Sequence, residues 1–287
     1  MFRVTLLLAL FITAVLCGTL SFFILRFYET QRYEEQFSSY TIQLGDRIEN
    51  GARQVVKTNA QTAVYTGLLY KDRSQWPFVY NPNFIDTYTR VSKISTISGL
   101  GVAPIFNVSL TSEFEDYVNT AITNQTGMPS NLKVNTDYGS PSENVRNIVA
   151  PMINIEPTGF FQLVDLVHIA YFEGQIDSIL DCVEKDSKAS FQHTERCVSI
   201  SHVSTVFAPV VFIFSPIYSY EAPEEVVGVV AAAIVLQLFL ENVSPHYISG
   251  IECVIYSISG AGGDSTPVGD IYTFTIGKTC NPLHTDQ

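Results

Sequence analysis

Apolar residues dominate the start of the chain: between Val4 and Leu25 there is no charged residue and no proline. At ~1.5 Å per residue, a helix over this segment extends for about 33 Å, which exceeds the ~30 Å hydrocarbon core of a bilayer. Arg3 and Arg26 flank the segment, where their charged groups reach the two membrane interfaces. The pattern predicts a transmembrane anchor over residues 1–27.

A cleaved signal peptide is the alternative for the same segment. Its apolar region would be only ~7–15 residues long and would end at a small-x-small cleavage site. The residues Phe22-Phe23-Ile24-Leu25 instead continue the apolar run beyond Cys17 and Gly18. The sequence therefore favours an uncleaved anchor.

Beyond the anchor, apolar residues recur every three or four positions, with charged residues between them. No proline interrupts the chain before Pro77. The apolar series is Phe37, Tyr40, Leu44, Ile48, Ala52, Val55, Val56, Ala60, Ala63 and Val64. A helix of roughly 40 residues is far longer than the mean of ~11–12. The pattern therefore predicts a stalk helix within residues 28–75, and the core helix of a globular domain is the alternative.

The remaining residues predict an α+β fold. Ser112 and Glu115 have the spacing of a capping box, and Gln175–Val183 has the period of a helix. The apolar segment Val226–Leu240 is too short to span a bilayer and is interpreted as a buried strand that runs into a helix. Other expected elements are a helix at Ile85–Ile97, ended by Gly99 and Gly101, and strands at Val102–Val108, Val206–Tyr218, Cys253–Ser259 and Tyr272–Ile276.

Charge is distributed unevenly. Residues 1–93 contain 10 Lys/Arg against 7 Asp/Glu, a net charge of +3, whereas residues 94–287 contain 6 against 21, a net charge of −15. An acidic main domain argues against nucleic acid and against binding along an anionic lipid surface. It is compatible with a cationic ligand, although a negative surface more commonly serves solubility.

Cysteine usage points to disulfide bonds. Four cysteines follow Cys17, namely Cys182, Cys197, Cys253 and Cys280. None has the C-x-x-C spacing of a zinc site, so an oxidising compartment with two disulfides is favoured, with four buried free thiols as the alternative. Sequence proximity favours Cys182–Cys197 and Cys253–Cys280, but all three pairings remain open.

The orientation of the anchor is inferred from other residues, because Arg3 on one side nearly balances Arg26 on the other. Asn107, Asn124 and Asn242 each begin an Asn-x-Ser/Thr triplet, the acceptor of N-glycosylation. Together with the cysteines, these triplets predict an extracellular C-terminal domain tethered to the plasma membrane.

Catalytic motifs are absent from the sequence, which contains no P-loop, no H-E-x-x-H and no G-x-S-x-G. Asp165 and His168 would share one face of a helix, but an isolated Asp/His pair is typically structural. We therefore expect no enzyme activity in this chain, with no catalytic, cofactor-binding or metal-binding residue.

Several short blocks resemble the extracellular, CHASE-like part of diatom-type receptor adenylate/guanylate cyclases. They are Trp76-Pro-Phe-Val, Phe114-Glu-Asp-Tyr, Val149-Ala-Pro-Met, Ala208-Pro-Val with Pro216-Ile-Tyr, Val226-Val-Gly-Val-Val and Ser249-Gly-Ile-Glu-Cys-Val. The resemblance implies PAS-like antiparallel sheets after the stalk. The expected units are a membrane-distal PAS-like unit at residues 76–204 and a membrane-proximal one at residues 205–287.

The same resemblance implies a function. In that family a second membrane helix and a class III cyclase domain follow, so we expect either a fragment of a larger receptor or a stand-alone sensor. The module would be a homodimer through the stalk and would bind a small-molecule or peptide ligand, to be sought first between residues 98 and 200. The alternative is a membrane-tethered adhesion or glycan/protein-binding ectodomain. One departure is that the cysteine that commonly follows the last block closely is here as distant as Cys280.

Overall fold

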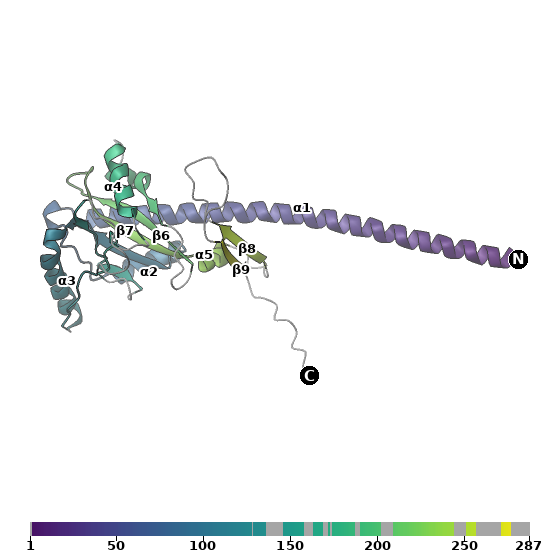
Figure 1. Cartoon of the computed structure of the whole chain (residues 1–287), viewed down its shortest axis with the longest axis horizontal. Helices are drawn as coiled ribbons and strands as arrows, with labels where there is room; N and C mark the ends of the chain where they lie inside the picture. The colour runs from purple at the N-terminus through teal and green to yellow at the C-terminus, as the bar shows by residue number, and fades with distance from the viewer. Residues whose placement is uncertain are drawn as a thin grey trace. The chain divides into compact units, whose positions relative to one another are not determined.

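A computed structural model of the chain describes residues 2–127, 129–135, 146–157, 163–168, 172, 174–186, 190–201, 209–243, 251–256 and 271–276. Within these residues the protein is α+β, with a long N-terminal apolar helix and antiparallel sheets, which confirms the expected class (Figure 1). The chain divides into two compact units, Met1–Glu49 and Asn50–Gln287, and each is described by itself.

Helix α1 spans Phe2–Leu69, so one helix contains both the apolar segment and the greater part of the expected stalk. No proline interrupts its hydrogen-bond ladder. Its apolar part contains a window with a mean hydropathy of 2.0, and the side chains from Leu10 to Leu25 are exposed. Among the described residues, α1 is the one helix that is long and apolar enough to cross a membrane. A segment of this kind occurs both in membrane anchors and in signal sequences.

The second unit is built on a five-stranded antiparallel sheet with the strand order β4-β1-β7-β6-β5. The strands are β1 (Gly99–Pro104), β4 (Asn154–Glu156), β5 (Ser199–Ile200), β6 (Val210–Tyr218) and β7 (Val226–Val235). The β6–β7 pairing extends from Val210 opposite Val235 to Tyr218 opposite Val226. Because β1 pairs with the other edge of β7, this strand lies at the centre of the sheet.

One face of the sheet, called here the aromatic face, carries Phe212 and Phe214 of β6 with Val229 and Ala231 of β7. These side chains form a continuous apolar core with Phe172 and with α4 (Gln175–Lys185). The helix α4 confirms the helix expected from the spacing of its apolar residues. In Figure 1, α4 lies on one side of β6 and β7, and α2 (Phe84–Ile94) lies on the other.

The opposite face, called here the helix face, carries Ile213, Ser215 and Ile217 of β6 with Val230 and Ala232 of β7, because alternate residues of a strand point to opposite sides. The C-terminal part of α1 lies against this face, where Asn59 hydrogen bonds to both strands. The sheet is therefore covered on both faces, which explains why β6 and β7 are apolar along most of their length.

Further elements surround this sheet. They are α3 (Thr111–Thr126), α5 (Leu236–Val243), the short pair β2 (Phe106–Asn107) and β3 (Ile148–Val149), the pair β8 (Ile251–Tyr256) and β9 (Ile271–Ile276), and the 3-10 helices η1 (Arg73–Gln75), η2 (Val108–Leu110) and η4 (Phe191–Cys197). Strand β7 passes directly into α5, which confirms the interpretation of Val226–Leu240. The strands β8 and β9 confirm the last two expected strands within the described residues.

Two local expectations are wrong. Gly99 and Gly101 do not end a helix: α2 ends at Ile94, and both glycines lie inside β1. Ser112 and Glu115 do not form a capping box, because the N-cap position of α3 is Leu110 and makes no side-chain capping bond. The Glu115 carboxylate instead accepts hydrogen bonds from the Val134 N–H at 2.8 Å and from Lys133 Nζ at 2.7 Å.

The five-stranded sheet crosses the expected division between residues 204 and 205. Strands β1, β4 and β5 precede this position and β6 and β7 follow it, yet all five pair within one sheet. The two expected units therefore share their sheet, because a strand as buried as β7 needs hydrogen-bonding neighbours on both edges.

Candidate functional site

The end of α1 and the segment that follows it surround a small cavity and an open groove. The cavity has a volume of ≈ 10 Å³, about the space for one water molecule. Its lining residues come from α1, α2, β1 and β4 and the loop before α2; they are Tyr65, Thr66, Leu69, Tyr70, Val79, Asn81, Phe84, Thr87, Val102 and Asn154. The adjoining groove of ≈ 440 Å³ opens to solvent and is lined by Leu69, Tyr70, Gln75, Phe78, Asn81 and Pro82.

Local hydrogen bonds fix the turn of the chain that follows α1. Asp72 Oδ1 accepts hydrogen bonds from the Ser74 N–H at 2.8 Å and from the Ser74 hydroxyl at 2.6 Å, and these bonds hold the pKa of Asp72 below its usual value. The buried Trp76 then donates its indole N–H to the Tyr70 carbonyl at 3.2 Å. Gly228 leaves room for this ring, since a Cβ at that position would stand 3.1 Å from it. The wall of the groove is thereby tied to the helix face.

One side of the cavity is fixed by a pair of asparagines. Asn154 Oδ1 accepts a hydrogen bond from the Asn81 N–H at 3.0 Å, and Asn154 Nδ2 donates one to the Asn81 carbonyl at 2.9 Å. The side-chain amide of Asn154 thus makes with the loop backbone the pair of hydrogen bonds that a neighbouring strand would make. The loop that carries Phe78 and Pro82 is held against β4 in this way.

Aromatic side chains give the groove its chemical character. Burial raises the pKa of Tyr70 to about 12, with smaller contributions from Tyr117 and Tyr65, and burial also raises the pKa of Tyr117. Tyrosine is protonated at neutral pH even at its ordinary pKa of ~10, and the shift widens that margin, so the Tyr70 hydroxyl in the groove can donate a hydrogen bond. Phe78 packs edge-on against Tyr117, with 5.5 Å between the ring centroids. Since no charged side chain lines the groove, it suits a ligand with apolar surface and a few hydrogen-bonding groups.

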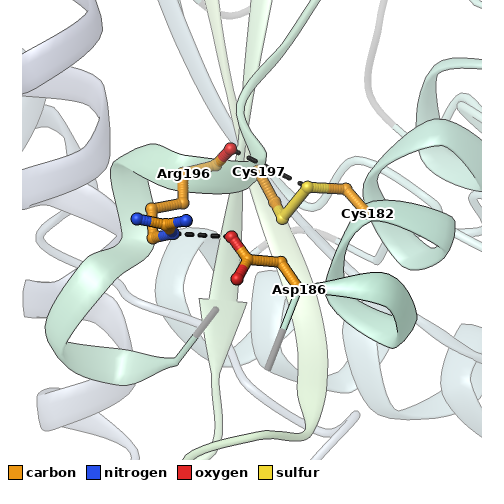
Figure 2. The surroundings of a disulfide bond; sticks show 4 residues. All are labelled: Cys182, Asp186, Arg196 and Cys197. Atoms are coloured by element: carbon orange, nitrogen blue, oxygen red, sulfur yellow. Dashed lines mark hydrogen bonds and ion pairs between the residues drawn. A yellow bond between two sulfur atoms is a disulfide. The ribbon is translucent and has the colours of Figure 1, made fainter. Parts of the chain in front are cut away.

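A disulfide bond joins α4 to η4. Cys182 and Cys197 are bonded across a sequence separation of 15 residues, the pairing that sequence proximity favours. Figure 2 shows the ion pair beside it, in which Arg196 Nε lies 2.6 Å from Asp186 Oδ2. The side chain of Cys253 and the whole of Cys280 lie outside the described residues. Cys17 is a free, exposed cysteine in α1.

Acidic side chains of α4 gather around one arginine. Arg146 forms ion pairs with Asp177 at 3.2 Å, with Glu184 at 2.7 Å and with Asp181. The hydrogen bond to Glu184 is the largest of the effects that raise the pKa of Arg146. The Arg146 guanidinium thus offsets part of the negative charge of these carboxylates. The described residues contain no group of three or more His, Cys, Asp or Glu side chains arranged for a metal ion.

The Asp165/His168 pair lies in a turn and not on a helix. Asp165 is fully buried, and its carboxylate accepts hydrogen bonds from the Ala150 N–H at 2.8 Å and the Val167 N–H at 3.1 Å. The other carboxylate oxygen contacts His168 Nδ1. These contacts tie two loop segments to the apolar core.

The three glycosylation candidates are exposed, which an attached glycan requires. Asn107 lies in β2, Asn124 in α3 and Asn242 in α5. Asn107 also has a local task, because its Oδ1 accepts a hydrogen bond from the Ser109 N–H at 3.0 Å.

Two features of the site were missed from the sequence. The groove was not predicted, although Val102 and Asn154 beside it fall within the range 98–200 that was expected to bind a ligand. Asn59 was not predicted either, although a polar residue between Val55 and Ala63 on an apolar helix row was a visible signal.

Comparisons of the chain with protein-family models and with curated proteins find no match. The function is therefore inferred from the geometry.

Proposed function

We propose that the chain is a membrane-anchored extracellular ligand-sensing module, the N-terminal part of a receptor-type nucleotide cyclase, which transmits through α1. The observation that carries this proposal is the continuity of α1, because one helix contains the apolar segment and also the residues that pack on the sheet. The disulfide and the exposed glycosylation triplets are further support, since both suit an oxidising extracellular space. The antiparallel sheet covered on both faces supports a PAS-like build.

The groove supports a sensing task because of its position. A ligand there would contact Leu69 and Tyr70, which belong to the last turn of α1 and the residue after it. A ligand shifts an equilibrium only by the difference between its affinities for two states. A ligand that binds at the end of α1 meets this condition if the groove changes shape when the helix moves.

The N-terminal unit supports a homodimer through the stalk. Tyr33 and Phe37 are exposed on one face of α1, and their rings are stacked with 6.1 Å between their centroids. Aromatic and aliphatic side chains on a helix beyond a membrane anchor are stabilised when a second helix covers them. A second copy of this chain is the partner that the proposal assigns to them.

The test uses the full chain in lipid nanodiscs. A thermal-shift screen of amino acids, nucleosides, sugars and short peptides identifies a ligand, and the disulfide yield of Phe37→Cys in the Cys17→Ser background is then measured with and without it. We expect the ligand to raise Tm and to change the cross-linking yield. The matched control is Gln43→Cys, an exposed position outside the apolar series.

A break in the helix sharpens this test. Gly45→Pro interrupts α1 at an exposed position, where an added Cβ would meet nothing within 4 Å beyond the neighbouring backbone of the helix itself. The change in cross-linking should disappear while ligand binding stays. Val55 is unsuitable for this purpose, because it is only 1% exposed and a proline there would also disturb the packing on the sheet.

The second candidate is a membrane-tethered adhesion or glycan/protein-binding ectodomain. The open, uncharged, aromatic groove is the observation that favours it, since a groove of this kind also suits a polymer lying across the surface. A ligand that raises Tm but leaves the cross-linking of Phe37→Cys unchanged would reject transmission and favour this candidate.

A further inference from the structure

On the side of α1, the contact with the helix face is made mostly of small side chains. The buried residues of this part of α1 are Val55, Thr58, Asn59, Ala60, Thr62, Ala63 and Thr66. Near the centre of the sheet the helix face carries Ser215, Val230 and Ala232, with the larger Ile213 and Ile217 of β6 on either side of Ser215. Large side chains that interlock as ridges in grooves resist sliding of one element along another. This contact has few of them, so its axial position must be fixed in another way.

The buried threonines do not fix it, because their hydroxyls bond within the helix. Thr62 Oγ1 donates to the Thr58 carbonyl at 2.9 Å, and Thr66 Oγ1 donates to the Thr62 carbonyl at 2.8 Å. Thr58 Oγ1 accepts a hydrogen bond from Gln54 Nε2 at 3.4 Å. All three bonds would travel with α1 if the helix moved.

Asn59 is the buried polar residue of this face that reaches the sheet. Its side chain is fully buried, and its Nδ2 lies 3.0 Å from the Ile213 carbonyl, 2.9 Å from Ser215 Oγ and 3.2 Å from the Val230 carbonyl. The amide thus bridges β6 and β7. Its Oδ1 is buried and finds no hydrogen-bond partner among the described residues. A half-satisfied buried amide costs stability compared with an apolar side chain, so it needs an explanation other than stability.

The spacing of the buried residues along α1 supplies an explanation for the buried amide. Thr58, Thr62 and Thr66 are four residues apart, and so are Val55, Asn59 and Ala63. If α1 shifted by four residues, about 6 Å at ~1.5 Å per residue, one threonine would take the place of the next, whereas Ala63 or Val55 would take the place of Asn59. The threonine row thus repeats itself in the shifted position, whereas the amide is lost from the place of Asn59. A single buried polar residue that specifies one register is the best-attested use of such a residue.

We infer that Asn59 sets the axial register of α1 on the sheet, and that a second register one turn away is the other state of this contact. The inference concerns the helix–sheet contact itself; its use in transmission rests on the proposed function. The far end of the helix is held by Trp76 and by the Arg73–Glu225 ion pair, whose side chains are 40% and 43% exposed. Salt weakens an exposed pair of this kind and should favour the second register.

The test measures the register directly in the full chain in nanodiscs, without ligand. Spin labels are attached to an encoded ketone amino acid at Gln61 and Glu224, both exposed, so that the cysteines stay as they are. Helix α1 runs along β6 toward the turn that contains Glu224, because Asn59 contacts Ser215 and Arg73 contacts Glu225. An axial shift therefore changes the distance between the labels.

The wild-type chain should give one distance. Asn59→Leu, which keeps the branching of the side chain, should give a second population roughly 6 Å away, and this population should grow at high salt. The control Thr62→Val removes a hydroxyl that bonds only within the helix, and it should give the wild-type distance. If Asn59→Leu does not fold, Asn59→Ser is measured with the same expectation.

A single, unchanged distance in the folded Asn59 variant at both salt concentrations overturns the inference. Because no ligand is present, a failed ligand screen leaves this result untouched. Conversely, a ligand response in the wild type together with one register in the variant would retain the proposed function and reject Asn59 as the residue that sets the register.

Discussion

The two faces of the five-stranded sheet are packed in different ways. On the aromatic face, Phe172 meets Phe212 and Phe214 edge-on, with ring centroids 4.7 and 5.3 Å apart, and the surrounding core is apolar. On the helix face, α1 offers alanines, threonines and one amide. Large interdigitating rings fix one arrangement, whereas small residues permit close approach with fewer interlocking contacts.

This difference assigns different tasks to the two faces. The aromatic face, reinforced by the disulfide between α4 and η4, holds the sheet as one body. The helix face provides the surface along which α1 is placed, and Asn59 marks the position. A sensor that transmits through a helix needs both a body that does not yield and a contact that has two states.

The largest effect should come from Phe214→Ala, which removes a fully buried ring from the aromatic face. We expect the free energy of unfolding to fall by about 3–5 kcal/mol because a cavity remains. Urea unfolding followed by circular dichroism measures the loss. The matched variant on the helix face, Thr62→Val, should cost about 1 kcal/mol or less. Equal losses would mean that the two faces do not differ in their packing.

The disulfide should contribute the next largest effect. Replacing both Cys182 and Cys197 by serine opens a loop of 15 residues, for which the loss is ~3 kcal/mol. The change should lower Tm in a thermal melt, and a reductant should lower the Tm of the variant less than that of the wild type. Cys17→Ser is the control, because this exposed cysteine is not bonded. A Tm equal to that of the wild type would show that α4 is held by the core alone.

Substitution of one glycine on each face tests how much room the neighbouring atoms leave for an added Cβ. An added Cβ at Gly228, on the helix face, would meet the Ala103 carbonyl at 2.9 Å, which backbone cannot easily move away. At Gly101, on the aromatic face, it would meet Met152 Sδ at 2.5 Å, a flexible side chain that can turn aside. We expect Gly228→Ala to cost ~1–3 kcal/mol and Gly101→Ala to cost less, as measured by urea unfolding. The reverse order would contradict the close approach of strands at Gly228.

Elements with a strong local signal were predicted correctly. The helix α4 follows from Ile176, Ile179 and Leu180 at helical spacing, and the passage from β7 into α5 follows from an apolar run too short for a membrane. Local sequence patterns gave wrong predictions where a side chain bonds to a distant part of the chain. Ser112 and Glu115 have the letters of a capping box, but the Glu115 carboxylate finds a better partner in the Val134 N–H, which sequence spacing does not reveal.

The candidate site shows the same limit. The groove depends on the bonds between Asn81 and Asn154, which are 73 residues apart, so no local pattern announces it. The pairing of β1 with β7 also joins residues far apart in the chain, and it crosses the division expected between residues 204 and 205. Asn59 is different: its position on an apolar row was readable, but its sheet partners Ile213 and Val230 were not.

The smallest effect concerns Tyr218, at the end of β6, whose buried hydroxyl has no hydrogen-bond partner among the described residues. Burial raises the pKa of Tyr218 to about 12, and Asp186 adds to the shift. The unfolded chain loses this proton near pH 10, so between about pH 10 and 12 it binds fewer protons than the folded chain, and stability falls as the pH rises. Tyr218→Phe should change the free energy of unfolding by about 1 kcal/mol or less at pH 7 and should flatten the alkaline decline. Urea unfolding at several pH values measures both quantities, and parallel declines in wild type and variant would assign the alkaline loss to other groups.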